Sequence, residues 1–274
     1  MKRHIIICVI ALLHFHLLKE KKNFAQGTLL PVPYPNVREA DVMWSKKVWR
    51  TIDLREKINL PFYYPPEPAQ SRISLFDVIK KEILSETILV YSPFPAVFSP
   101  DEEFKIQFTF SEAKKMLLKE INISVQDTAT GDMSVSTITD TIVSADVTQF
   151  WIKEEWFFDK QRSVTDVHIL GIAPVVETQG SDGEFKGYKP LFWLYYPACR
   201  ELFSEYKWYN SFNDAGMRTY DEIFHKRLFS STITMESNVY NRPIVSYAGG
   251  MDILLEAERI KKKIFEFQHD LWHY

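Results

Sequence analysis

Apolar residues recur along this chain with two different periods, and the two periods predict a mixed fold. Over residues 37–58 apolar residues such as Val48 and Ile52 recur at helical spacing, with lysines and arginines between them. This pattern predicts a helix. Residues 75–84 show the same spacing directly after Ser74, a residue type that commonly caps a helix N-terminus. A second helix is therefore expected there.

The middle of the chain carries residue types that favour strands. Residues 150–158 and 163–172 are rich in aromatic and β-branched residues and flank a polar turn, which predicts an antiparallel hairpin. Residues 121–125 and 134–142 predict a second, exposed hairpin or mobile loop. The other segments expected in this region are a strand at 87–91, a short helix at 111–118, a helical turn at 144–148, a polar loop at 178–189 and a strand at 190–196.

The last third of the chain is predicted to be helical. Helices are expected over 198–206, over 214–229 and from Asp252 to the end of the chain. In the last of these, a stripe of apolar residues three and four apart should face a core; it comprises Ile253, Ala257, Ile260, Ile264 and Phe267/Leu271. The sequence therefore predicts an α+β fold, in which an antiparallel sheet from the middle of the chain packs with helices.

The amino terminus has the pattern of a secretory signal. A cationic start precedes an apolar run over residues 4–18, and small Ala25 precedes the expected cut. The run is shorter than the roughly 20 residues of a spanning helix. Charged residues 19–22 separate it from the cut, so an uncleaved anchor is the second interpretation. We expect three parts, namely a signal at 1–26, an extended Pro-rich arm with one helix at 27–70, and an α+β core domain at 71–274.

Composition narrows the classes of function. Removing residues 1–26 takes away five cations and one anion, so the formal net charge changes from −3 to −7. An acidic chain is poorly suited to binding nucleic acid, which requires a basic face. With 46% hydrophobic residues, the chain can bury a large core. We expect a soluble protein outside the cytoplasm.

Few residues suggest catalysis. His269 and His273 share one face of the predicted terminal helix at a spacing that can hold zinc, but we interpret them as surface or packing residues. Cys199 is interpreted as a buried, inert thiol. Glu154 and Glu155 would point to opposite faces of a strand, so we expect solvated charges. The sequence predicts no cofactor and no metal. A periplasmic hydrolase using His269/His273 or Cys199 is the alternative function, and a small-molecule binding protein with an aromatic pocket is a third.

Two proline-rich straps carry the residues that we expect to bind a partner. Proline restricts the unfolded chain, so such a segment loses little freedom on docking. The straps lie at 28–35 and 60–68, and their aromatic residues could instead pack on the chain itself. The partner-binding residues expected are Pro33, Tyr34, Pro35, Phe62, Tyr63 and Tyr64.

Seven ordered segments resemble the GldN/PorN family of gliding motility and type IX secretion proteins of Bacteroidetes. They are Glu39–Pro61, Ile152–Ser163, Ile169–Pro174, Leu191–Arg200, Thr219–Phe224, Ser237–Tyr240 and Glu266–His273. The resemblance covers the chain from about residue 36 to its end and is weakest over 121–149 and 178–188.

The resemblance implies a non-enzymatic structural subunit of a periplasmic ring. It implies association with the outer membrane through a lipoprotein partner, GldK or PorK, and contact with further copies of the chain. It also implies contact with the periplasmic part of GldM/PorM and the GldL/PorL motor. The family carries no catalytic residues that could be transferred, and the acidic charge gives no reason to expect a nucleic-acid partner.

Overall fold

The computed structural model describes residues 30–69, 72–93, 104–126, 133–180, 184–208 and 218–271. Residues 31–274 form one compact unit, and residues 1–30 are assigned to another. No helix in the described ranges is long and apolar enough to cross a membrane.

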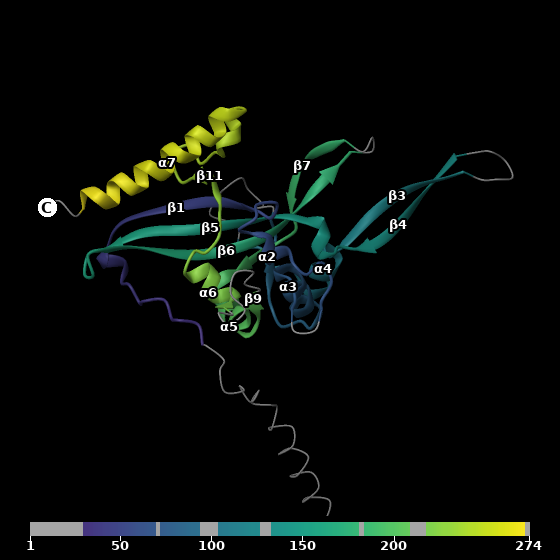
Figure 1. Cartoon of the computed structure of the whole chain (residues 1–274), viewed down its shortest axis with the longest axis horizontal. Helices are drawn as coiled ribbons and strands as arrows, with labels where there is room; N and C mark the ends of the chain where they lie inside the picture. Colours follow the sequence, from purple (N-terminus) through teal and green to yellow (C-terminus); the bar gives the residue numbers. More distant parts are fainter. Residues whose placement is uncertain are drawn as a thin grey trace, which may run out of the picture. The chain divides into compact units, whose positions relative to one another are not determined.

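The central sheet is antiparallel and confirms the predicted α+β class (Figure 1). Its strands follow the order β11-β1-β5-β6-β8-β2, and β7 pairs with β6. The strands of the sheet are β1 (Val42–Asp53), β2 (Val90–Tyr91), β5 (Val147–Asp159), β6 (Val164–Gln179), β7 (Phe185–Pro190), β8 (Trp193–Tyr195) and β11 (Thr232–Glu236).

Helices and two small ladders complete the described structure. The α-helices are α2 (Leu60–Tyr63), α3 (Leu75–Leu84), α4 (Phe110–Met116), α5 (Tyr196–Glu205), α6 (Tyr220–His225) and α7 (Met251–Asp270). The 3₁₀ helices are η1 (Glu39–Asp41), η2 (Ser144–Asp146) and η3 (Ile244–Ser246). The small ladders pair β3 (Leu118–Gln126) with β4 (Met133–Thr141), and β9 (Lys207–Trp208) with β10 (Arg218–Thr219).

Several predicted elements are confirmed. The hairpin of β5 and β6 pairs from Asp159↔Val164 to Val147↔Val176, which is longer than the aromatic runs alone indicated. The second hairpin, β3–β4, forms a ladder separate from the central sheet. Helix α3 begins after Ser74, whose Oγ accepts a hydrogen bond from the Asp77 amide at 3.1 Å.

The helix predicted over residues 37–58 is wrong, because this segment contains strand β1. Val48 and Ile52 are four residues apart, which puts them on one face of a helix and equally on one face of a strand. The segment also holds tryptophan, valine and threonine, which favour strands. β1 pairs with β5 on one side and with β11 on the other. Part of the segment expected to be an arm is therefore a strand inside the sheet.

Other differences concern the loop and the last third of the chain. Part of the loop predicted at 178–189 is strand β7, which pairs with β6. Strand β11 was not predicted. Within the helix predicted at 214–229, only Tyr220–His225 is α-helical among the described residues. The start of that helix, from 214 to 217, lies outside the described residues.

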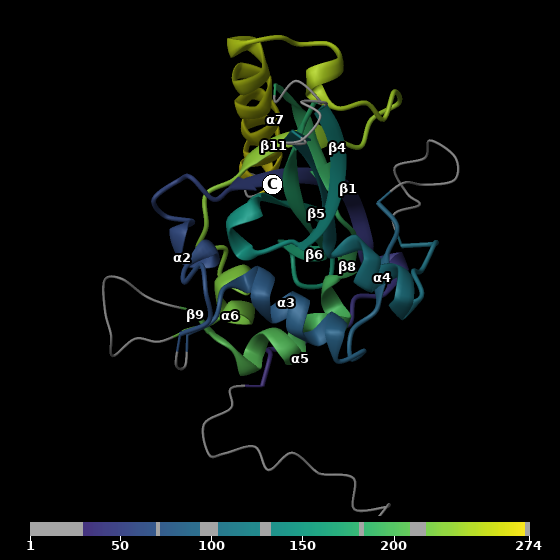
Figure 2. The same cartoon turned by 90° about the vertical axis from the view of Figure 1, so that its right-hand side faces the viewer.

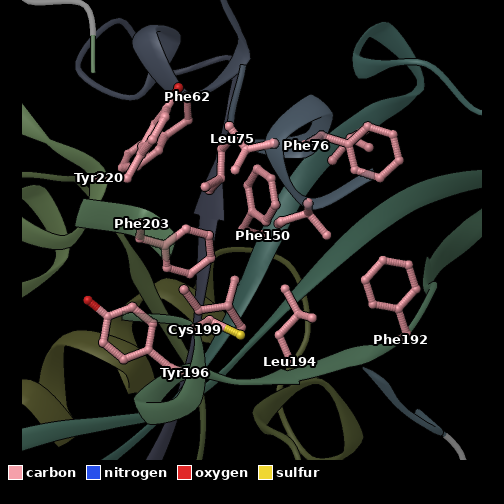
Figure 3. Packing of buried hydrophobic residues seen from close by; sticks show 14 of the residues in the cluster. Phe62, Leu75, Phe76, Phe150, Phe192, Leu194, Tyr196, Cys199, Phe203 and Tyr220 are labelled. Atoms are coloured by element: carbon pink, nitrogen blue, oxygen red, sulfur yellow. The ribbon is translucent and has the colours of Figure 1, made fainter. Parts of the chain in front are cut away.

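One large apolar cluster joins the sheet to α3, α5 and α6. These helices gather on one side of β5 and β6 (Figure 2). The largest residues of this cluster are aromatic, and several face one another in Figure 3. The fully buried aromatic residues are Phe62, Phe76, Phe150, Phe192, Tyr196, Phe203, Tyr220 and Phe224.

A second cluster lies under α7. Ala257, Ile260 and Ile264 are buried against Val48 of β1 and Ile233 of β11. The predicted stripe of α7 is therefore confirmed. Val48 and Ile52 share a face of β1 but belong to different clusters, so the two clusters lie at successive positions along the same face.

Gly171 in β6 is a position of close approach. A Cβ placed there would lie 2.9 Å from Cε1 of Phe104 and 3.1 Å from the carbonyl oxygen of Leu194, and closer still to Cζ of Phe104. Contacts this short require a neighbour to move. Phe104 packs edge-on against Tyr91, Trp193 and Tyr195, so the absence of a side chain at Gly171 makes room for this aromatic ring.

Gly171→Ala should lower the free energy of unfolding by about 1–3 kcal/mol, because overpacking displaces the Phe104 ring. Urea unfolding measures this change. Gly249→Ala is the matched control, since a Cβ there meets no atom within 4 Å. Equal stability of the two variants would contradict the close packing of Phe104 over β6.

Candidate interface

The first strap is anchored to the fold by Tyr34. Its ring stacks on the imidazole of His168 in β6, with 4.1 Å between centroids. The guanidinium carbon of Arg200 lies 4.3 Å from the ring centroid, a cation–π distance. Burial raises the pKa of Tyr34 to about 12, although Arg200 opposes the shift. We call His168 and Arg200 the Tyr34 seat.

The Tyr34 seat rests on a buried ion pair. Nε of Arg200 donates to Oδ1 of Asp221 at 2.8 Å, and a second guanidinium nitrogen donates to Oδ2 at 3.1 Å. The hydroxyl of Tyr196 also donates to Oδ1, at 2.8 Å. Burial would lower the pKa of Arg200, but its hydrogen bonds to Asp221 raise it. Arg200 therefore stays charged and is held by α5 and α6 in a fixed orientation.

The other predicted partner-binding residues fall into two groups. Pro33, Pro35 and Tyr64 are exposed. Phe62 is buried, with its ring centroid 5.4 Å from that of Phe224, and half-buried Tyr63 packs against the same core. Phe62 and Tyr34 therefore belong to the chain's own packing, whereas the prolines and Tyr64 face outward.

The described structure also corrects the expectation for Glu154. It was expected to be solvated, but it is fully buried. Its Oε1 lies 2.8 Å from a guanidinium nitrogen of Arg227, and its Oε2 accepts a hydrogen bond from Trp156 Nε1 at 3.0 Å. The two carboxylates do point to opposite faces of β5, but the face that carries Glu154 is buried and not exposed to solvent. Glu155, on the other face, is half-buried.

Exposed apolar side chains are concentrated near the carboxyl end. Met251 is 70% exposed, Leu255 is 62% exposed and Phe265 is 63% exposed, and all three belong to α7. We call the whole group the C-terminal apolar surface; it consists of Val239, Tyr240, Val245, Tyr247, Met251, Leu254, Leu255 and Phe265. Exposed apolar side chains of this kind mark a protein–protein contact where they form one contiguous patch.

The residues considered for catalysis are not assembled into a site in the described chain. His269 is exposed and 3.8 Å from Asp270, and His273 lies outside the described residues. Within the described ranges, no three His, Cys, Asp or Glu residues could together hold a metal ion. Cys199 is buried, as predicted, and burial raises the pKa of its thiol to about 12.

Sequence reasoning missed the Tyr34 seat. In the sequence, His168 lies within the strand predicted at 163–172 and Asp221 within the helix predicted at 214–229. No spacing in the sequence links Arg200 to Asp221. The one local signal is that Asp221 follows Thr219, which caps α6, so an acidic residue is expected in this first turn, but not a buried one.

Comparison with known families gives one match. A family model described as "Gliding motility associated protein GldN" matches residues 37–273, which is nearly the whole described unit. No curated protein matches the chain.

The Cys199 thiol should resist modification in the native chain. With a pKa of about 12, only about 10⁻⁴ of it is thiolate at pH 8, and thiolate is the reactive form. A thiol reagent in a Cys8→Ser chain, whose only thiol is Cys199, measures this. Slow labelling in buffer and fast labelling in denaturant are expected; fast labelling in buffer would restore the nucleophile hypothesis.

The imidazole of His168 should titrate below its usual pKa of 6.5, because burial disfavours its charged form. Arg162, Arg200 and His225 act in the same direction, and Asp166 opposes them. Because the folded chain favours the neutral imidazole, the unfolded chain takes up a proton first as the pH falls. The contribution of His168 to the free energy of unfolding is therefore present above pH 6.5 and is lost as the pH falls through the lowered pKa.

NMR titration of the His168 ring protons measures this pKa. Tyr34→Ala should raise it toward 6.5, because the ring that shields His168 from water is removed. Tyr64→Ala is the matched control, since Tyr64 is exposed and packs on Tyr63. A pKa that is the same in all three chains would show that Tyr34 does not cover His168.

Proposed function

This chain belongs to the GldN family of gliding-motility-associated proteins, and we propose that it is a non-enzymatic structural subunit of the periplasmic ring of the type IX secretion machine. In this proposal it assembles with an outer-membrane lipoprotein of the GldK/PorK kind and with further copies of itself. It also contacts the periplasmic part of GldM/PorM and the GldL/PorL motor. Its place is the periplasm, at the outer membrane.

The C-terminal apolar surface carries the proposal. Met251, Leu254 and Leu255 are exposed although Ala257, Ile260 and Ile264 of the same helix are packed into a core. A helix that needs only one apolar face for its own fold gains nothing from a second one. Apolar side chains left in water are stabilised when a partner covers them.

Two further observations support an assembly role. The secretory pattern of residues 1–26 fits a periplasmic protein. The charged residues of α7 pair mostly within the helix, such as Glu256 with Arg259 at 2.5 Å and Glu258 with Lys261 at 3.1 Å. Such pairs support the helix and reduce the charge that a partner would have to desolvate.

We assign the C-terminal apolar surface to the lipoprotein partner. The Tyr34 seat is formed by α5 and β6, whereas the apolar surface is formed by α7 and the residues before it. Because the two surfaces are formed by different elements, one subunit can bind the lipoprotein through the C-terminal apolar surface and a sibling copy elsewhere at the same time. Contact with the motor proteins rests on the family alone.

Leu255→Glu should abolish co-purification with the lipoprotein and leave the fold intact. A charge at the centre of an apolar contact would be desolvated without a counter-charge. The free energy of unfolding of the isolated chain should change by no more than about 0.5 kcal/mol, since Leu255 is on the surface. Affinity purification from outer-membrane fractions measures the association.

Ser111→Glu is the matched control, because Ser111 is exposed on α4 and the charge change is the same. It should co-purify normally. If Leu255→Glu still binds the lipoprotein but no longer self-associates, the surface belongs to a sibling copy. If it retains both associations, the surface has no part in assembly.

A further inference from the structure

We propose that in the assembled state the Tyr34 seat receives the strap of a neighbouring copy, so that straps are exchanged around the assembly. We define the strap here as residues 31–37. The inference rests on the proposed assembly function and deepens it, because it names which segment of one copy binds which surface of the next.

The seat is built without the strap. Arg200 is fixed by its two hydrogen bonds to Asp221, and Asp221 is fixed further by Tyr196. His168 lies in β6, where it pairs with Glu155 of β5. Phe157 packs edge-on against the imidazole at 4.6 Å. The surface that accepts Tyr34 is thus preformed by residues outside the strap.

The strap itself has one anchor. Val32 is 59% exposed, and Pro33, Pro35 and Asn36 are exposed as well. Among the described residues, no backbone–backbone hydrogen bond joins 31–37 to the sheet or helices. The first such bond along the chain is donated by the Lys160 amide to the carbonyl oxygen of Asp41, at 2.9 Å. Releasing Tyr34 would therefore detach the strap without opening the core.

One polar atom of the Tyr34 seat is unpaired. Nε2 of His168 is buried and has no hydrogen-bond partner in the described part of the chain. A buried nitrogen without a partner is unfavourable. The isolated chain therefore holds Tyr34 in a seat whose hydrogen bonds are incomplete, and a neighbouring copy could supply the missing donor or acceptor.

The link between strap and fold is long enough for exchange. Residues 35–38 connect Tyr34 to the 3₁₀ helix η1, which begins at Glu39, and an extended chain of this length reaches roughly 17 Å. Exchange keeps the same stacking and cation–π contacts, so its balance depends on how closely the copies are held. Strap and seat are different surfaces, and such head-to-tail contacts close into rings.

Isotope-mixed photo-cross-linking tests the inference in the assembled protein. Chains carrying Pro33→p-benzoylphenylalanine keep the Tyr34 anchor and place the cross-linker beside it. Light and ¹⁵N-labelled chains are mixed in equal amounts, assembled with the lipoprotein, checked by size and irradiated. Mass spectrometry then gives the isotope composition of the cross-linked peptides that join the strap to the region of 162–168 or 196–203.

Exchange predicts that about half of these peptides join a light chain to a heavy one, as random neighbours would. The same chains at low concentration without the lipoprotein should give cross-links of one isotope only. Adding Tyr34→Ala should abolish cross-linking to the seat in both states.

The outcomes separate the two proposals. Assembly in which every seat cross-link joins peptides of one isotope overturns strap exchange and leaves the assembly function standing. Chains that keep Pro33 are mixed with the lipoprotein as a control, and their failure to assemble at all overturns both proposals.

Discussion

The buried ion pair between Arg200 and Asp221 links the aromatic core of this protein to its surface. It joins α5 to α6, and the same guanidinium contacts Tyr34 from the strap. Apolar contacts are not directional, so the large cluster alone would not fix how α5 and α6 are rotated. A bidentate pair does, because the planar guanidinium matches the carboxylate in only one orientation.

A buried ion pair stabilises the fold only while both partners are present. Both groups lose their hydration in the core, and removing one partner of a buried pair costs about 3–5 kcal/mol because the other remains charged. Glu154 and Arg227 form a second pair that is partly buried. It involves β5, near the boundary between the two apolar clusters, where Arg50 of β1 donates to Ser231 Oγ at 2.8 Å. Apolar burial holds the strands and helices together, and these charged residues fix how the strands and helices are oriented relative to one another.

Much of the fold could be predicted from local pattern. The aromatic hairpin β5–β6, the capped helix α3 and the stripe of α7 each have one period and clear end signals. β1 could not be predicted in this way, since Val48 and Ile52 fit both periods and only pairing with β5 and β11 decides between them. The Tyr34 seat was beyond prediction for a related reason: Tyr34, His168, Arg200 and Asp221 meet only through the tertiary fold.

Arg200 has two roles, pairing with Asp221 and supporting Tyr34. Arg200→Lys weakens both, because lysine keeps the charge but lacks the planar group that pairs with Asp221 at two atoms and stacks on Tyr34. The direct measurement is the NMR shift of the His168 ring protons, which the stacked Tyr34 ring displaces upfield. In folded Arg200→Lys, we expect this displacement to fall to the value of a Tyr34→Ala chain. An unchanged shift would show that Tyr34 is seated without Arg200, and would contradict the central place of the ion pair.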